Sequence, residues 1–149
     1  MTFEIISAKA THMLDMQNIN LRNLPENYTL KYYAYHLMMW PQLSFVCLID
    51  TKVAGYCLGK IEEDDTDHGH ITSLAVHPQY RRLGIAKKLI TLSIYQMQQA
   101  WKAKGVYLHV RISNKNAQGL YEQLGFETEK TEEGYYQDGE DALSMKLIC

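Results

Sequence analysis

The sequence has 149 residues, which fits one domain and is enough to bury a sizeable apolar core without disulfides or metals. Its 15 basic and 17 acidic residues give a formal net charge of −2, so bulk charge does not indicate a nucleic-acid partner. No apolar run approaches the roughly 18 residues of a membrane-spanning helix, no signal peptide is recognisable, and the 3 cysteines form no closely spaced pair. We therefore expect an intracellular, cytoplasmic protein with free thiols.

The first part of the chain is predicted to alternate between strands and helices. The strand segments are rich in Val, Ile, Leu, Phe and Tyr, whereas the helical segments carry apolar residues at intervals of three and four. Asp50-Thr51-Lys52 is predicted to be the turn of a hairpin, in which Cys47 and Cys57 are expected to be buried, inert thiols. The expected elements are a strand over 3–8, helices over 11–22 and 30–39, and paired strands over 44–49 and 53–60.

Thr11 is the expected N-cap of the first helix, because a hydroxyl can accept from the unpaired N–H groups of the first turn. The apolar residues after it are expected to share one face that packs in the core or against a partner rather than on a cofactor. These residues are Met13, Leu14, Met16, Ile19 and Leu21.

The segment between the first two helices has two possible roles. Pro25 breaks the helical pattern, and the loop Leu24-Pro25-Glu26-Asn27-Tyr28 carries a leucine, a carboxylate and a tyrosine. The loop could form one wall of a pocket, or it could be a connector with Glu26 in solvent.

An acidic run over 62–67 precedes His68-Gly69-His70, which raises the possibility of a metal site. No further ligands follow at a suitable spacing, so we expect a solvated loop and no metal.

The central stretch has the order expected of an anion site. A strand over 70–76 ends before Pro78, and Arg81-Arg82 then precede Gly84 and a one-sided amphipathic helix over 83–103. The first N–H groups of a helix can bind a phosphate, and the arginine forks match its oxygens. Gly84 and Ala86 leave the backbone accessible. Such a loop could also do no more than solvate the start of the helix.

The last third is predicted to contain three strands and one helix. Gly105 is expected to end the central helix, and Gly125 to adopt the left-handed conformation after the last one. In the strand over 106–110, His109 is expected on the face opposite Leu108, where it could be a core residue or a base at a strand end. The other expected elements are a helix over 117–124, a strand from 126 and a strand over 142–147.

This order of elements resembles the GNAT acetyltransferases, whose R/Q-x-x-G-x-G/A loop holds the pyrophosphate of acetyl-CoA. Arg81-Arg82-Leu83-Gly84-Ile85-Ala86 has that pattern, and Asn114, Tyr121 and Gly125-Phe126 follow where the family has them. The resemblance implies an α/β (α+β) fold in a single domain over 1–149. A mixed central sheet of about seven strands would be flanked by about four helices.

Further blocks are similar to the catalytic subunit of NatA-type N-terminal acetyltransferases. They cover residues 24–28, 31–33, 40–44, 68–76, 108–111 and 135–142. Leu124-Gly125-Phe126 departs from this branch and has the general GNAT form. The similarity implies a cytoplasmic N-alpha-acetyltransferase that acts on Ser, Ala, Thr or Gly N-termini after methionine removal. A large helical-repeat auxiliary subunit, and through it the ribosome, would be its partner, and acidic N-termini could be accepted by the free subunit.

The resemblance also implies roles for individual residues. The implied acetyl-CoA ligands are Leu74, Val76, Arg81, Arg82, Leu83, Gly84, Ile85, Ala86, Asn114 and Tyr121. The implied peptide-binding residues are Leu24, Glu26, Tyr28, Tyr135 and Tyr136. The candidate catalytic groups are Glu26, His109, Tyr121 and Tyr136.

A reaction can be outlined from these groups. The α-amino group, with a pKa of about 7.7–8.0, is an easier nucleophile than lysine at about 10.4. Glu26 and His109 are both candidate bases, and the sequence does not rank them. No cysteine lies in the motif segments, so we expect direct transfer in a ternary complex. The alternatives are a stand-alone N-terminal acetyltransferase of the ribosomal-protein or archaeal kind, a lysine acetyltransferase, and a non-catalytic acetyl-CoA-binding subunit.

Overall fold

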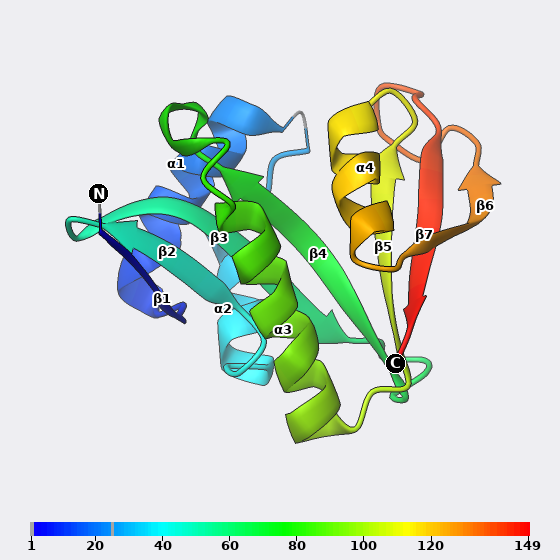
Figure 1. Cartoon of the computed structure of the whole chain (residues 1–149), viewed down its shortest axis with the longest axis horizontal. Coiled ribbons are helices and arrows are strands. Elements are labelled where there is room, and N and C mark those ends of the chain that lie inside the picture. The colour runs from blue at the N-terminus through cyan, green and yellow to red at the C-terminus, as the bar shows by residue number, and fades with distance from the viewer. Residues whose placement is uncertain (1, 25) are drawn as a thin grey trace.

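The computed structural model describes residues 2–24 and 26–149. Its centre is a 7-stranded sheet in the order β1-β2-β3-β4-β5-β7-β6 (Figure 1). The strands are β1 (Phe3–Ser7), β2 (Phe45–Ile49), β3 (Lys52–Ile61), β4 (His68–Val76), β5 (Gly105–Arg111), β6 (Glu127–Glu132) and β7 (Ala142–Ile148). The helices are α1 (Met13–Asn23), α2 (Leu30–Met39), α3 (Ile85–Trp101) and α4 (Lys115–Gln123), with short 3₁₀ segments η1 (Ala10–His12) and η2 (Pro78–Tyr80). The predicted order and the mixed α/β class are confirmed.

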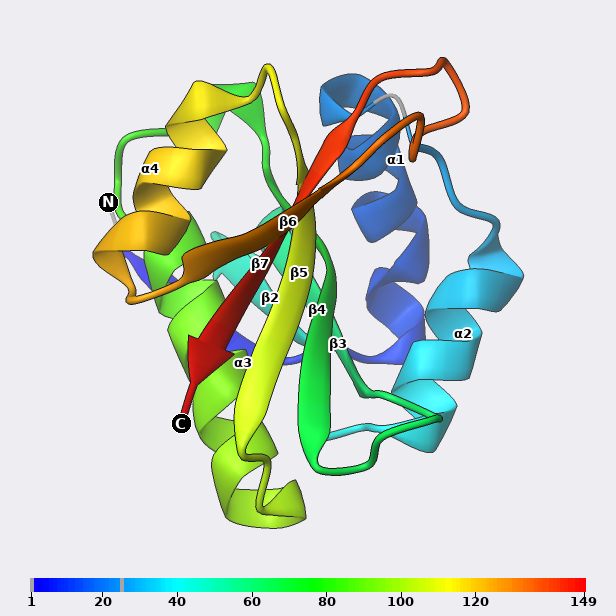
Figure 2. The same ribbon diagram turned by 90° about the vertical axis from the view of Figure 1, so that its right-hand side faces the viewer.

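The helices cover both faces of the sheet. In Figure 2 the sheet is seen nearly edge-on, with α3 and α4 on one side and α1 and α2 on the other. This arrangement encloses two apolar clusters, one on each face of the sheet. Each strand of the middle of the sheet is therefore covered on both sides, which explains why β2 and β3 read as almost continuous apolar runs.

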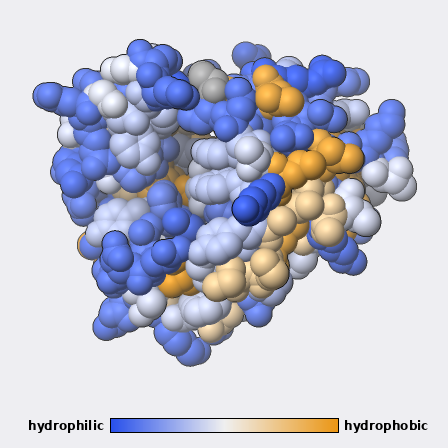
Figure 3. All heavy atoms as spheres, turned by 180° about the vertical axis from the view of Figure 1, so that it is seen from behind, coloured by the Kyte–Doolittle hydropathy of each residue, from blue (hydrophilic) through white to orange (hydrophobic). Residues whose placement is uncertain are grey.

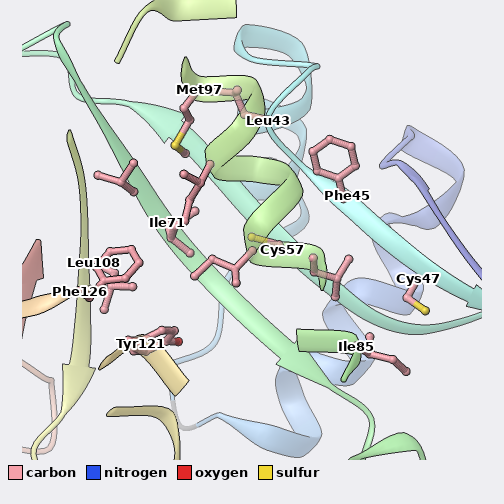
Figure 4. Close-up of a cluster of buried hydrophobic side chains, with 14 of the residues drawn as sticks. Leu43, Phe45, Cys47, Cys57, Ile71, Ile85, Met97, Leu108, Tyr121 and Phe126 are labelled. Carbon is pink, nitrogen blue, oxygen red and sulfur yellow. The ribbon is translucent and has the colours of Figure 1, made fainter. Parts of the chain in front are cut away.

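The larger cluster lies between the sheet and α3. Its helix residues Ile85, Leu89, Ile90, Ile94 and Met97 recur at the intervals that place side chains on one face (Figure 4 labels Ile85 and Met97). The helix approaches closely because β3 has Gly59 beneath it. A Cβ at that position would lie 2.6 Å from the Ser93 hydroxyl and 2.7 Å from the Leu43 carbonyl. The predicted amphipathic face of this helix is confirmed.

The smaller cluster lies between the sheet and the pair α1 and α2. Met16 and Ile19 are buried there with Tyr33 and Tyr56, as expected for the inner face of α1. Leu14 and Leu21 were expected on the same face but do not share its burial, because they are 63% and 57% exposed. At about 100° per residue they point away from the Met16 direction, so only a narrower stripe of the helix reaches the sheet.

Several predicted boundaries are corrected by the structure. Thr11 is not the N-cap, because it lies within η1; His12 precedes α1 and makes no side-chain capping bond. The central helix begins at Ile85, and Lys102, with φ 56°, takes the left-handed position after it. Gly105 starts β5 instead, where a Cβ would lie 2.9 Å from the His68 ring. Gly125 has the expected positive φ of 101°.

The strands β4 and β5 form the parallel pair on which the site depends. They are paired from His68 and Gly105 as far as Ile71 and Leu108, but β4 continues to Val76. Beyond Ile71 the two strands diverge, as the ribbon in Figure 1 shows. A register shift in the β3–β4 ladder between Leu58 and Gly59 occurs at the level where the divergence begins. The sheet therefore opens in its middle.

The break expected at Pro25 lies outside the described residues; α1 ends at Asn23 and α2 begins at Leu30. Within residues 2–24 and 26–149, no helix combines the length and the apolar character that crossing a bilayer requires.

Candidate active site

Two pockets meet where β4 and β5 diverge. We call them the helix pocket, with a volume of about 400 Å³, and the loop pocket, with about 100 Å³. The helix pocket extends to Val76, Arg81 and Ala86 near the start of α3. The loop pocket extends to Glu26, Tyr28, His109, Arg111 and Tyr136 on the side of the 24–28 loop. Both are lined by Leu24, Leu74, Asn114, Ala117 and Tyr121. Two bound molecules could therefore meet at these shared residues.

The helix pocket has the features of an anion site at one end. Arg81 reaches it from the loop before α3, where its Nε donates to the Val76 carbonyl at 3.3 Å and its Nη2 to the Asn23 side chain. Gly84 is the residue before α3, with a φ of 78°, and a Cβ there would meet no atom within 4 Å. The unpaired N–H groups at the start of α3 are thus accessible to an anion.

The structure separates the predicted acetyl-CoA ligands into two groups. The side chains or backbones of Leu74, Val76, Arg81, Ala86, Asn114 and Tyr121 line the helix pocket. Arg82 is exposed with a φ of 67°, Leu83 is 42% exposed, and neither lines this pocket. The Ile85 side chain is 2% exposed and belongs to the core, so a ligand could meet only its backbone. The pattern of the motif therefore mixes ligand-facing and structural residues.

The 24–28 loop is held in place by α1. Gln17 donates its side-chain amide to the Tyr28 carbonyl at 3.1 Å, and the buried Asn20 donates to the Glu26 carbonyl at 3.0 Å. The Tyr28 ring stacks on Tyr32 with centroids 4.5 Å apart. Of the two interpretations of this loop, the structure supports the pocket wall, because Leu24, Glu26 and Tyr28 all line the loop pocket.

Arg111 is the central residue that the sequence reasoning missed. It ends β5, and its side chain is 12% exposed. Its Nε donates to Glu26 at 2.8 Å and its Nη1 to Glu140 at 2.7 Å and Asp138 at 3.0 Å. The guanidinium also lies 4.1 Å from the centroid of the Tyr136 ring. Arg111 therefore connects the 24–28 loop to the loop before β7.

These carboxylates are affected by Arg111. Hydrogen bonds from the Glu140 backbone N–H and from Arg111 lower the pKa of Asp138 below its usual range. Hydrogen bonds from Ser113 and from Arg111 likewise lower the pKa of Glu140. A signal for Arg111 was available in the sequence, since it lies two residues after His109 and so on the same face of the strand. The carboxylates that hold it come from other segments, which no local pattern identifies.

His109 lies between the loop pocket and a third pocket, which we call the outer pocket. Its Nε2 donates to Glu132 at 2.5 Å, its ring stacks on Tyr135 with centroids 4.4 Å apart, and the His70 ring lies 5.6 Å away. Burial and the neighbouring His70 lower the pKa of His109, although Glu132 acts in the opposite direction. The imidazole is therefore neutral near pH 7, as a base must be.

The tyrosines have different positions. Tyr121 is 8% exposed at the junction of the two pockets, and burial raises the pKa of its phenol. Burial likewise raises the pKa of Tyr28 and of Tyr136, so these phenols remain protonated donors at neutral pH. Tyr135 was expected in contact with the peptide, but it is 47% exposed, does not line the loop pocket and covers His109 instead.

The histidines considered as metal ligands have carboxylate neighbours. His68 Nδ1 lies 2.7 Å from Asp65, and His70 Nδ1 lies 2.7 Å from Glu62. Among the described residues no group of three or more His, Cys, Asp or Glu side chains is arranged to hold a metal ion.

Comparison with known proteins assigns this geometry to a family. The model of the acetyltransferase (GNAT) family matches residues 13–126. The chain is 51% identical over 144 residues to an N-alpha-acetyltransferase of Caenorhabditis elegans, covering 93% of this chain and 79% of that protein. It is 49% identical to the N-terminal acetyltransferase A complex catalytic subunit of Schizosaccharomyces pombe, covering 95% and 83%.

More distant matches agree. An archaeal N-alpha-acetyltransferase, from Sulfurisphaera tokodaii, is 38% identical, with 96% of this chain and 91% of that protein covered. A solved NatC complex bound to Gag peptide and CoA contains a chain with a TM-score of 0.92 and 26% identity, with 100% and 99% covered. The chain therefore belongs to the acetyltransferase (GNAT) family and, within it, to the N-alpha-acetyltransferases.

Proposed function

We propose that this protein is the catalytic subunit of an N-terminal acetyltransferase of the A type. It transfers the acetyl group of acetyl-CoA to the free α-amine of proteins in the cytoplasm. Its preferred acceptors are Ser, Ala, Thr and Gly N-termini exposed by methionine removal. The observation that carries the proposal is the meeting of the helix pocket and the loop pocket at Tyr121, with a paired carboxylate, Glu26, on the loop side.

The helix pocket is the proposed site of acetyl-CoA. Arg81 and the N–H groups at the start of α3 suit its pyrophosphate, and the edge of β4 from Leu74 to Val76 can pair with its amide-containing arm. Arg82, Leu83, Gly84 and Ile85 complete the turn that presents those N–H groups. Asn114 caps α4 by accepting from the Ala117 N–H at 3.2 Å, which fixes the opposite wall.

The loop pocket is the proposed site of the acceptor. The carboxylate of Glu26, which accepts a hydrogen bond from Arg111 Nε at 2.8 Å, is suited to hold the amine nitrogen, which becomes positive during attack. Leu24 and Tyr28 bound the space for the first side chain, and Tyr136 donates a hydrogen bond from the other side. A volume of about 100 Å³ favours small first residues. Glu26 also disfavours acidic first residues in this arrangement.

The chemistry needs three further contributions. The oxyanion formed on attack is met by backbone N–H groups near Val76. A thiolate, whose conjugate acid has a pKa of about 8.5, is a weaker base than the phenolate of a buried tyrosine, so Tyr121 donates a hydrogen bond to the leaving sulfur and keeps its proton. His109 takes the proton of the amine, and its lowered pKa suits that role.

Transfer is direct, in a ternary complex. Cys47 and Cys57 are buried, and burial raises the pKa of the Cys57 thiol to about 12. Neither of them, nor Cys149, lines the helix pocket or the loop pocket. A covalent acetyl-cysteine therefore has no support from the site.

An auxiliary subunit is proposed to bind the outer side of α1 and α2. Leu14, Leu21, Met38 and Met39 are 50–75% exposed on these helices. Figure 3 shows apolar side chains gathered on this face of the molecule. Large apolar patches on a protein surface are typical of partner sites. A large helical-repeat subunit that also contacts the ribosome is the partner proposed for it.

A stand-alone N-terminal acetyltransferase of the archaeal kind is the second candidate. It is favoured by the match to the archaeal enzyme, which extends over 96% of this chain. The exposed leucines and methionines of α1 and α2 favour the subunit.

One experiment separates these functions. The purified chain, alone and with the partner that co-purifies with it, is given acetyl-CoA and peptides that begin with Ser, Ala, Glu or Met-Leu. Peptides with a blocked N-terminus and a free lysine are included. The proposal expects Ser and Ala peptides to be acetylated best with the partner bound. Equal rates without a partner support the stand-alone enzyme, transfer to lysine supports a lysine acetyltransferase, and cofactor binding without turnover indicates a non-catalytic subunit.

Glu26→Ala tests the acceptor site within that experiment. It is expected to impair acetylation of Ser and Ala peptides and to leave the KM for acetyl-CoA unchanged, because Glu26 lines only the loop pocket. Unchanged kinetics with these peptides would remove Glu26 from the site.

A further inference from the structure

His109 has a carboxylate partner on the side away from the loop pocket. Its Nε2 lies 2.5 Å from Glu132 Oε2, and the two side chains are 20% and 30% exposed. A carboxylate accepts hydrogen bonds and has no proton to give, so Nε2 carries the hydrogen. In the neutral ring, Nδ1 must then be the nitrogen with the lone pair.

The other nitrogen of the ring has no hydrogen-bond partner. His109 Nδ1 is buried and has no hydrogen-bond partner among the described residues. His109 lines the loop pocket, whereas Glu132 lines only the outer pocket. The Tyr135 ring, parallel to the imidazole within 8°, covers one of its faces and fixes its plane. Nδ1 is therefore the ring nitrogen that remains available for a proton from the loop pocket.

The fold explains how a residue on an edge strand reaches His109. The strand β7 separates β5 from β6, and it has Ala142 and Ser144 where the Glu132 side chain crosses β7 to reach His109. Both residues are buried, and both are small. A larger side chain at either position would fill the space over β7 and keep Glu132 from the imidazole.

We propose that Glu132 holds His109 in the tautomer that accepts the amine proton on Nδ1, and that it stabilises the imidazolium that this transfer forms. This inference rests on the proposed function. As the amine nitrogen bonds to the acetyl carbon and the C–S bond breaks, the amine proton passes to Nδ1 and the ring becomes an imidazolium paired with Glu132. The Nδ1 proton then passes through water to the departing thiolate, so protons and charge balance and the ring returns to its Nε2–H form. Glu132 is thus a positioning residue.

The surroundings of His109 are suited to stabilise its imidazolium. Glu62 and His70 form a pair with atoms 2.7 Å apart beside the His109 ring, and Lys130 Nζ lies 3.5 Å from Glu132. The groups that face His109 are His70 from β4, Glu62 after β3, Glu132 and Lys130 from β6, Ser144 from β7, Tyr135 before β7, and Tyr107 and Arg111 from β5 itself. Carboxylates exceed cations on the outer side, which stabilises a positive charge on the His109 ring.

Glu132→Gln tests the proposal. Gln is neutral and keeps the shape, but its amide can also donate to Nε2 and so stabilise the wrong tautomer. The kcat at saturating acetyl-CoA and Ser-starting peptide is expected to fall about 10- to 100-fold, as it does when the carboxylate partner of a metal-bound imidazole is removed. The acidic limb of kcat against pH is expected to move to lower pH, because Glu132 raises the pKa of His109. The KM for acetyl-CoA stays unchanged.

Glu133→Gln is the matched control, because it removes the same charge from the next, exposed residue. It is expected to keep both kcat and the pH profile. Glu132→Asp, which keeps the carboxylate, is expected to recover part of the rate. Thermal stabilisation by acetyl-CoA checks that each variant is folded.

A second readout does not depend on turnover. The ¹⁵N shifts of the His109 ring are expected to show the Nε2–H tautomer in the wild type and a mixture in Glu132→Gln. A wild-type Nδ1–H tautomer, or a Glu132→Gln enzyme with unchanged kcat and pH profile, would overturn the proposal. If the wild type acetylates no free N-terminus, the proposed function fails, and the ring tautomer alone decides the role of Glu132.

Discussion

Replacing Arg111 by methionine tests how the acceptor site is held together. The side chain of Arg111 donates to Glu26 at 2.8 Å and to Glu140 at 2.7 Å, and methionine keeps most of its length without the charge. A hydrogen bond to a charged group contributes about 1.5–3 kcal/mol. If the Glu26 contact is what orients the carboxylate for the acceptor, its loss corresponds to a fall in kcat/KM for peptide of roughly 10- to 150-fold, at 1.4 kcal/mol for each factor of ten.

Initial rates with Ser-starting peptides and acetyl-CoA, each varied at saturation of the other, measure this effect. The loss is expected in the kinetic parameters of the peptide, with the KM for acetyl-CoA unchanged, since Arg111 lines only the loop pocket. Lys104→Met is the matched control, because its ion pair with Asp67 spans 3.5 Å between side chains that are 74% and 59% exposed. Equal peptide kinetics for the wild type and Arg111→Met would refute the reasoning.

Three further predictions concern the core and the cofactor site. Burial lowers the pKa of His36 from 6.5 to about 4, so between these pH values the unfolded chain binds a proton at His36 and the folded chain does not. The contribution of neutral His36 to the free energy of unfolding is therefore complete above pH 6.5, and the free energy falls by about 3 kcal/mol as the pH drops to 4. Denaturant titrations of His36→Gln should lack that slope, and an unchanged slope would assign it to another group. Gly59→Ala should lower the free energy of unfolding by about 1–3 kcal/mol, because its Cβ would collide with the Leu43 carbonyl, and unchanged stability would show that the backbone moves at no cost. Arg81→Ala should raise the KM for acetyl-CoA more than Arg82→Ala does, since only Arg81 lines the helix pocket, and the reverse order would place the pyrophosphate elsewhere.

The order of strands and helices was predictable because it depends on local periodicity. Alternation in β5 correctly placed Tyr107 and His109 on one face and Leu108 and Val110 on the other. The one-sided pattern of α3 likewise identified the core face, because that helix packs on the sheet from Ile85 to Met97. In α1, by contrast, periodicity could not distinguish a buried stripe from the exposed Leu14, since both faces carry apolar residues.

The site was predictable only in part. Resemblance identified the loop before α3 and the 24–28 loop, and the structure places residues of both around the two pockets. The contacts of Arg111 and Glu132 join segments that are 85 and 23 residues apart, so no local pattern could reveal them. Tyr135 and Tyr136 were both expected to contact the peptide. The sequence does not show the conformation of the turn that contains them, so it could not show that only Tyr136 lines the loop pocket.

The divergence of β4 and β5 leaves a free strand edge inside the sheet. From Thr72 to Val76 the side of β4 that faces β5 has no ladder partner in the described part of the chain. Free edges invite pairing with another chain, and proteins usually cover them. Acetyl-CoA bound along this edge would cover it, as well as stabilise the fold by mass action. Bound acetyl-CoA should therefore protect the protein from aggregation. Without acetyl-CoA, the protein should aggregate at a lower temperature on warming than when it is saturated.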